Sequence, residues 1–165
     1  LLDMGMDPFN FADALLGILA QRLAKRLCKE CKEAYQPDQG EIKQLLQEYC
    51  EELAHTDAWK KDPKGSMEAI YKDWGARYAK GGKFTLYRAK GCTACNDTGY
   101  KGRVGLHELM VGTDAVKKLI QEKARVAEIL ACALNEGMRT LKMDGIEKVV
   151  QGITDMKQVR AVCIK

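Results

Sequence analysis

The strongest constraint on the fold of this chain is a set of four cysteines in two Cys-x-x-Cys pairs, Cys28 with Cys31 and Cys92 with Cys95. Two residues between cysteines allow a tight turn to aim both thiolates at one ion, and two such turns supply the four tetrahedral ligands that Zn²⁺ prefers. The 60 residues from 32 to 91 exceed the usual separation of about 15 to 20. We expect one structural zinc site that closes a long loop and has no open coordination position.

A redox dithiol is the competing interpretation of a Cys-x-x-Cys pair. The first pair follows a predicted helix, whereas a reactive dithiol needs a helix N-terminus to stabilise its thiolate, so zinc is favoured. Seven cysteines, an odd number, argue against a complete disulfide framework and favour a reducing compartment, here the cytoplasm. The other three, Cys50, Cys132 and Cys163, lie in helical patterns and are interpreted as small apolar residues.

Charge and hydropathy give no positive sign of nucleic-acid binding or of a membrane span. Lys and Arg exceed Asp and Glu by 27 to 23, a surplus of +4 that is too small to indicate nucleic-acid binding. Several bases flank the cysteine pairs, where they are placed to balance a negative zinc tetrathiolate; the alternative is that they are ordinary solvated side chains. These bases are Lys29, Lys32, Lys90, Lys101 and Arg103. No apolar run approaches the roughly 20 residues of a membrane span.

Hydrophobic periodicity predicts a mostly α-helical fold with a small β-hairpin, in which a tetracysteine zinc module joins a C-terminal helical subdomain. Four segments are expected: a long core helix and the first cysteine pair in 1–35, a helical insertion in 36–83, a hairpin carrying the second pair in 84–111, and the helical subdomain in 112–165. The long helix begins at Asp7-Pro8 and runs to the first cysteine pair. Its apolar stripe comprises Phe11, Ala12, Leu15, Leu16, Leu19, Leu23 and Leu27.

The elements within the middle segments are also predictable. In the insertion, one amphipathic helix includes residues 42–53 and a second is capped by Ser66, with residues 62–65 forming the turn between them. The hairpin should pair residues 84–88 with 103–110. The aromatic helices of the insertion form either a partner-docking element or a self-contained cap.

Motifs for enzymatic chemistry are missing from the sequence. Gly81-Gly82-Lys83 is the nearest match to a P-loop, but Phe84 stands where a Ser or Thr would bind Mg²⁺. His107-Glu108 lacks the second histidine of a zinc-protease motif, and both His55 and His107 are interpreted as ordinary surface or hydrogen-bonding residues. By its own residues the chain is not an enzyme.

Two stretches together resemble the C-terminal part of the type II secretion and type IV pilus assembly ATPases. The first runs from residues 2–9 through 19–23 to Cys28, and the second comprises 91–95 and 99–109. Asp144-Gly145, Lys148, Gly152 and Thr154 also match the closing helical segment of that family. The resemblance covers residues 1–35 and 84–165, whereas 36–83 depart from the compact family pattern.

The resemblance implies a fragment of a hexameric motor, cytoplasmic and peripheral to the bacterial inner membrane. A RecA-like domain preceding Leu1 would bind ATP and Mg²⁺, contact neighbouring subunits of a homohexamer and drive an inner-membrane platform. Cys28, Cys31, Cys92 and Cys95 would be the family's metal ligands. Arg22 and Arg103 are candidates to face the motor core or a neighbouring subunit.

A free-standing zinc-ribbon adaptor that binds protein or nucleic acid is the alternative. The two hypotheses differ in whether a P-loop and a Walker B motif precede this segment in the same polypeptide. The motor hypothesis further predicts that the isolated fragment neither binds ATP well nor hydrolyses it, and that it is monomeric or weakly associated.

Overall fold

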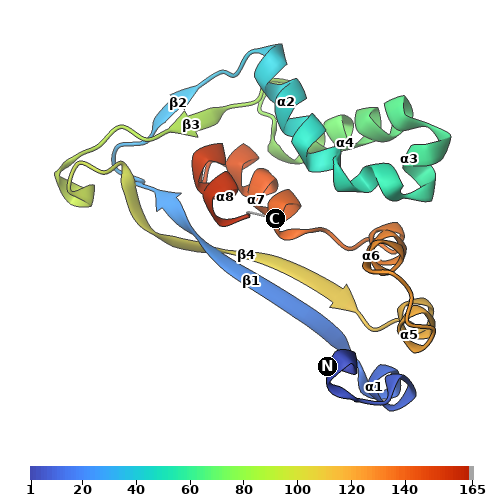
Figure 1. Ribbon diagram of the computed structural model, residues 1–165. Helices are drawn as coiled ribbons and strands as arrows, with labels where there is room; N and C mark the ends of the chain where they lie inside the picture. The colour runs from blue at the N-terminus through green and yellow to red at the C-terminus, as the bar shows by residue number, and fades with distance from the viewer. Residues whose placement is uncertain (164–165) are drawn as a thin grey trace.

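A computed structural model describes residues 1–163 of the chain (Figure 1). Its α-helices are α1 (Pro8–Ala14), α2 (Gln39–Cys50), α3 (Asp57–Lys61), α4 (Pro63–Tyr78), α5 (Asp114–Gln121), α6 (Val126–Asn135), α7 (Leu141–Val150) and α8 (Met156–Val162). Its strands are β1 (Gly17–Leu27), β2 (Glu33–Tyr35), β3 (Leu86–Arg88) and β4 (Tyr100–Val111), and three short 3₁₀ turns are η1 (Leu2–Met4), η2 (Glu52–His55) and η3 (Thr93–Cys95).

A long antiparallel ribbon of β1 and β4 is the central element of the fold. Gly17 pairs with Val111 at one end and Lys25 with Arg103 near the other, and the register shifts between Lys25 and Leu27. Figure 1 shows α7 and α8 over one face of this ribbon, with α2 and α4 beyond them and α5 and α6 toward the far end of β4. The two C-terminal helices therefore lie between the ribbon and the helices of 36–83.

The predicted helix through the first cysteine pair is wrong beyond Ala14, because residues 17–27 form β1. Its apolar residues fit a period of two as well as a helical period: Ala24 is buried beneath the C-terminal helices, while Leu19 and Leu23 lie on the opposite face of the strand. Pairing with β4, more than 70 residues later in the chain, satisfies the backbone of this segment. Tertiary pairing thus overrides the local helical pattern.

The predicted strands at 84–88 and 103–110 are present as β3 and β4, but they do not pair with each other. In the structure β3 pairs with β2, and β4 pairs with β1. Each strand of the second half of the chain thus pairs with a strand that adjoins the first cysteine pair. The two cysteine turns are brought to the same end of the ribbon by these two separate pairings.

Residues 36–83 share one hydrophobic core with the C-terminal helices, so this segment is not a self-contained cap. Trp74 of α4 is fully buried and packs edge-to-face on Tyr49 of α2, with ring centroids 5.1 Å apart. The same cluster contains Ile146 and Val149 of α7 and Val159 of α8. α4 begins earlier than predicted, because Asp62 rather than Ser66 caps it and Pro63 occupies the first helical position.

Polar contacts also join this segment to the C-terminal helices. Arg160 of α8 forms an ion pair with Glu48 of α2, and Arg77 of α4 donates to Glu147 of α7 at 2.8 Å. The Tyr78 hydroxyl donates to the same Glu147 at 3.0 Å. These contacts fix α2 and α4 against α7 and α8.

The expected fold class is confirmed. The described residues are mostly helical with a smaller share of antiparallel β structure, the four cysteines lie together, and helices α5 to α8 follow the second pair. None of the helices in this described part is long and apolar enough to cross a membrane.

Close packing of α7 on the ribbon gives a test of this arrangement. A Cβ added at Gly145 would lie 2.7 Å from Val159 Cγ1 and 3.1 Å from Leu106 Cδ1, whereas one at Gly75 of α4 would meet nothing within 4 Å. We predict that Gly145→Ala lowers the free energy of unfolding by about 1 to 2 kcal/mol, because overpacking outweighs the gain in helix propensity. Gly75→Ala, the matched control, should raise it by up to about 1 kcal/mol in the same urea titrations. A stabilising Gly145→Ala would contradict the packing described here.

Candidate metal centre

The two predicted cysteine pairs come together at one end of the β1/β4 ribbon. Cys28 and Cys31 lie in the turn that follows β1. Cys92 directly precedes the 3₁₀ turn η3 and Cys95 is its last residue, shortly before β4 begins. All four Sγ atoms lie within 4.8 Å of one another. Cys28 and Cys95 are buried, and the other two are half-buried.

The sulfur separations match a tetrahedral tetrathiolate. Sγ of Cys28 lies 3.9 Å from Sγ of Cys92, Cys31 and Cys95 are also 3.9 Å apart, and Cys92 and Cys95 are 3.8 Å apart. Four sulfurs at the usual Zn–S distance of about 2.3 Å would be about 3.8 Å from each other at tetrahedral angles. A disulfide bond, at about 2.0 Å, is far shorter than these separations.

Backbone N–H groups point at two of the sulfurs. Gly91 donates to Cys31 Sγ at 3.3 Å, while Cys92 and Gly99 donate to Cys95 Sγ at 3.3 and 3.2 Å. Such donors stabilise a thiolate and leave its remaining lone pairs for a metal ion. Burial disfavours the Cys95 thiolate, but hydrogen bonds from the Cys92 and Gly99 backbone and from the Cys92 and Cys31 thiols together lower the pKa of this thiol to about 6. Burial raises the pKa of Cys31 to about 11, against the opposing effect of its Gly91 donor.

Two glycines are required by the geometry of the second turn. Gly91 has φ +117°, and a Cβ there would lie 2.9 Å from the carbonyl oxygen of Asp97. Gly99 has φ +80°, and its Cβ would lie 2.6 Å from that of Ala89. Only glycine adopts such backbone angles readily. The carbonyl of Gly99 also accepts from the Cys28 N–H at 2.9 Å, which joins the two turns directly.

The four-sulfur donor set could therefore hold a metal ion, and its chemistry suits a soft or borderline cation such as Zn²⁺. Neither histidine belongs to this group in the described residues: His55 is exposed, and the His107 backbone donates to Asp144 Oδ2 at 2.8 Å. Cys50, Cys132 and Cys163 also lie outside it. Four sulfur ligands would fill a tetrahedral shell and leave no position for water or substrate.

The bases near the cysteines have separate roles in the structure. Lys32 donates to the carbonyl of Gly152 at 2.7 Å, and Lys90 forms an exposed ion pair with Glu33 at 3.1 Å. Lys29, Lys101 and Arg103 are exposed. Arg22, the other arginine singled out from the sequence, is exposed on β1 and donates to the carbonyl of its neighbour Gln21. The contact between Lys32 and Gly152, just beyond α7, could not be read from the sequence, because it joins residues 120 positions apart.

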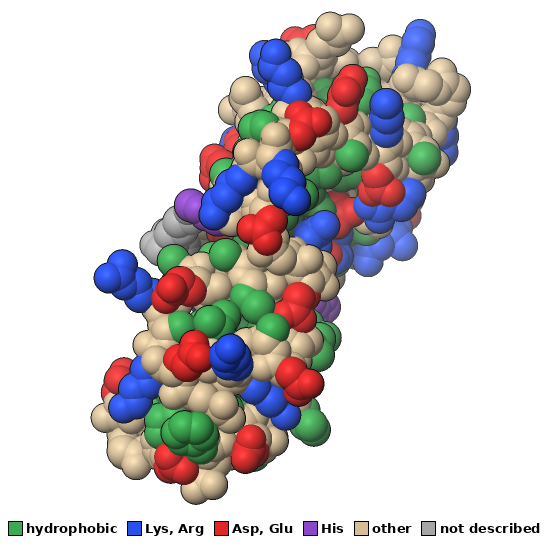
Figure 2. Space-filling model, turned by 90° about the vertical axis from the view of Figure 1, so that its right-hand side faces the viewer, with side chains coloured by type: hydrophobic (Ala, Val, Ile, Leu, Met, Phe, Trp, Pro, Cys, Tyr) green, Lys and Arg blue, Asp and Glu red, His purple; other side chains and the backbone are tan. Residues whose placement is uncertain are grey.

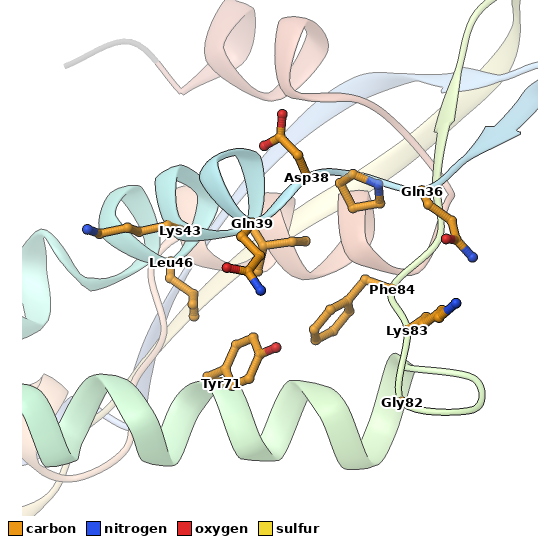
Figure 3. A pocket seen from close by; sticks show the side chains of 11 residues that line it. Gln36, Asp38, Gln39, Lys43, Leu46, Tyr71, Gly82, Lys83 and Phe84 are labelled. Atoms are coloured by element: carbon orange, nitrogen blue, oxygen red, sulfur yellow. The ribbon is translucent and has the colours of Figure 1, made fainter.

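A cavity of about 590 Å³ lies away from the cysteines, between α2, α4 and the 82–84 loop (Figure 3). Ile42, Leu46 and Phe84 provide apolar walls, and Figure 3 shows Tyr71 and Gln39 directed into the space between them. No motif from the sequence maps to this cavity apart from Gly82 and Lys83, which form a tight turn closed by the Lys80–Lys83 bridge. The P-loop-like residues therefore have a structural role.

The face shown in Figure 2 has no patch of side chains that all carry the same charge. Lys and Arg side chains are interspersed there with Asp and Glu side chains. A nucleic-acid interface would gather bases on one face or along one groove.

Comparison with known proteins identifies relatives of the whole chain. The family described as Type II/IV secretion system protein matches residues 1–161, including 36–83, which lies outside the two stretches that carry the resemblance. The type IV pilus assembly ATPase PilB of Thermus thermophilus is 36% identical over 163 residues, which are 99% of this chain and 15% of that protein.

Two further relatives agree with this match. The type II secretion system ATPase E of Vibrio cholerae is 35% identical over 98% of this chain and 26% of its own length. The type IV pilus assembly ATPase PilB of Myxococcus xanthus is 36% identical over 96% of this chain and 23% of its own length. The chain thus spans about a quarter or less of the length of these relatives.

Proposed function

Because the chain belongs to the Type II/IV secretion system protein family, we propose that it is the C-terminal domain of a secretion or pilus assembly ATPase. Its task is to hold the motor together and to transmit force, and it hydrolyses no ATP by itself. The observation that carries the proposal is the match over residues 1–161 to a family whose similar members are ATPases of these two systems.

Zinc is the proposed metal, bound by Cys28, Cys31, Cys92 and Cys95. Sulfur separations of 3.8 to 3.9 Å and backbone donors to two sulfurs support a closed, structural site. The residues would clamp the start of β4 to the end of β1 and so fix the register of the ribbon. The four-segment division of the chain stays part of this proposal.

The unpartnered face of the β1/β4 ribbon is the proposed docking surface for the nucleotide-binding domain. Leu19 and Leu109 are cross-strand partners on this face and are 61% and 52% exposed, and Val111 beside them is 55% exposed. Contiguous exposed apolar side chains of this kind indicate a surface that is covered in the assembled protein. In the described residues, α7 and α8 lie on the other face of the ribbon (Figure 1), while at its far end Leu109 and Val111 line a small cavity with Ala133 and Glu136 of α6.

The edges of the ribbon support the same proposal. In the described part of the chain this sheet consists of β1, with 11 residues, and β4, with 12. Each strand therefore has one edge without a strand partner. Open strand edges of this length pair readily with further strands. The N-terminal end of the chain lies beside the foot of β1, where a preceding domain would join (Figure 1).

The remaining parts of the proposal follow from the family. ATP and Mg²⁺ bind in a RecA-like domain outside this segment, neighbouring subunits form a homohexamer, and the motor acts on an inner-membrane platform from the cytoplasm. Arg103 is exposed on the same face as Leu109 and would face that core, whereas Arg22 lies on the opposite face beside α7 and α8 and would face a neighbouring subunit. The zinc-ribbon adaptor is not proposed, because the similar proteins are ATPases and the charges in Figure 2 are interspersed.

The docking surface can be tested with Leu109→Glu in the full-length protein. A carboxylate buried in an apolar interface costs several kcal/mol, and each 1.4 kcal/mol is a factor of ten. We predict that ATP hydrolysis falls at least tenfold, while the thermal midpoint of the isolated chain changes little because Leu109 is half exposed there.

Val126→Glu is the matched control, since Val126 is 83% exposed on α6, away from this face. It should leave ATP hydrolysis unchanged. Equal rates for Leu109→Glu and the unsubstituted protein would refute the docking surface. A full-length protein without ATP hydrolysis, or with tight, salt-sensitive binding to DNA or RNA, would instead support the adaptor.

The metal proposal predicts that Cys92→Ser abolishes zinc retention and destabilises the chain. A ligand present at a hundred to a thousand times its Kd stabilises the folded state by about 3 to 4 kcal/mol, so a loss of at least about 3 kcal/mol is expected in denaturant titrations. Cys132→Ser is the control: its half-buried thiol contacts only Glu136 at 3.2 Å among the polar groups of the described residues, and serine can replace that contact.

Cys132→Ser should therefore keep one zinc per chain and nearly full stability. Zinc content equal in the two variants would speak against the tetracysteine site. Reversible disulfides in both pairs under mild oxidation, with no metal released, would establish the redox alternative.

A further inference from the structure

The turn between α7 and α8 receives contacts from several elements near the cysteines. The Leu27 N–H at the end of β1 donates to the carbonyl of Ile153 at 3.0 Å, and the buried Thr154 hydroxyl donates to the carbonyl of Lys25 at 2.8 Å. The Tyr100 hydroxyl at the start of β4 donates to Asp155. This turn, residues 152–155, thus binds both strands of the ribbon beside the metal centre.

Lys32 provides the contact from the first cysteine turn itself. It directly follows Cys31, and its backbone N–H donates to the carbonyl of Cys28 at 3.0 Å. Its Nζ donates to the carbonyl of Gly152 at 2.7 Å. That carbonyl lies just beyond the C-terminal end of α7, where a cation interacts favourably with the helix dipole. The backbone of Lys32 is therefore part of the first cysteine turn, while its side chain binds the turn between α7 and α8.

Tyr87 of β3 fixes the position of the lysine side chain. The Lys32 ammonium lies 4.2 Å from the centroid of the Tyr87 ring, which is within the range of a cation–π interaction. The same ring packs on Gly152, where a Cβ would lie only 2.5 Å from a ring carbon. Gly152 has φ +78°, so two independent features demand glycine there. Lys32, Tyr87 and Gly152 are thus in mutual contact.

We propose that Lys32 is a positioning residue that couples the cysteine centre to the C-terminal helix pair α7 and α8. Metal binding fixes the first cysteine turn and hence the lysine, which then orders the 152–155 turn. The ordered turn in return holds the first cysteine turn in its ligating geometry. Such coupling is reciprocal, so the metal and the turn stabilise each other by the same factor. The inference rests on the metal site proposed above.

A purely structural lysine would behave differently. Its removal would lower stability by the same amount with and without metal, because the contacts to Gly152 and Tyr87 would be independent of the cysteines. Coupling instead predicts that the effect of Lys32 depends on the metal. The two cases are therefore distinguished by whether the effect of removing Lys32 changes when the metal is removed. A loss of stability alone does not distinguish them.

Hydrogen exchange on the unsubstituted chain is the first measurement. Chelation of zinc should speed amide exchange at least fivefold in residues 152–159. The α3–α4 junction, residues 57–66, lies at the far end of the insertion and should show a smaller change. No substitution is needed, so this result does not depend on whether a variant folds. Unchanged exchange in the turn on chelation would overturn the proposal.

Lys32→Met is the second measurement, since it keeps a long side chain and removes the donor. We expect zinc affinity, measured by competition with a chromophoric chelator, to fall about tenfold. Exchange in the 152–155 turn should then respond little to chelation. Lys32→Arg, which restores a donor of similar reach, should recover most of the affinity.

Lys29→Met is the matched control, because Lys29 is an exposed base in the same cysteine turn with no hydrogen bond or ion pair in the described residues. It should keep the zinc affinity of the unsubstituted chain. If Lys32→Met and Lys29→Met bound zinc with equal affinity, the coupling would be refuted but the metal site would not. Absence of zinc from the unsubstituted chain would refute the metal proposal itself, so the two failures are distinguishable.

Discussion

The convergence of four cysteine side chains from two distant segments is the constraint on which this structure depends. Bringing the pairs together closes a loop of about 60 residues, which costs chain entropy before any local contact forms. The backbone donors from Gly91, Cys92 and Gly99 are arranged around sulfur, and the Cys28 N–H is bonded to the second turn. A shared metal ion would offset the cost of closure and align the ends of β1 and β4.

The rest of the fold extends this junction into one rigid unit. The ribbon lies on α7 and α8, and these helices in turn share a core with α2 and α4. Gly145 permits close approach of α7 to Leu106 of the ribbon, and the Glu48–Arg160 ion pair closes the outer layer. Under the proposed function, this unit, continuous from the cysteine cluster to the outer helices, would transmit movement from the motor domain. The exposed apolar face of the ribbon is where that movement would enter.

The sequence predicted best what is encoded over a few residues. Both Cys-x-x-Cys turns were predictable because their chemistry is local, and so was the helix start at Asp7-Pro8, where the Asp7 side chain accepts from the Asn10 N–H three residues on. The Asp62 cap was missed because Ser66, a few residues later, also fits a capping position. The strand at 17–27 was missed because its leucines satisfy a helical period too, and its partner β4 lies far along the chain. The pairing of β3 with β2 and the hydrogen bond from Lys32 to Gly152 could not be predicted from local patterns either, because both join residues distant in the sequence.

X-ray absorption spectroscopy at the zinc edge, on protein purified without chelators, tests the central claim most directly. The account predicts a single shell of four sulfur neighbours at about 2.3 Å, with no lighter ligand. Nitrogen or oxygen neighbours at about 2.0 to 2.1 Å, or protein that contains no zinc, would contradict it.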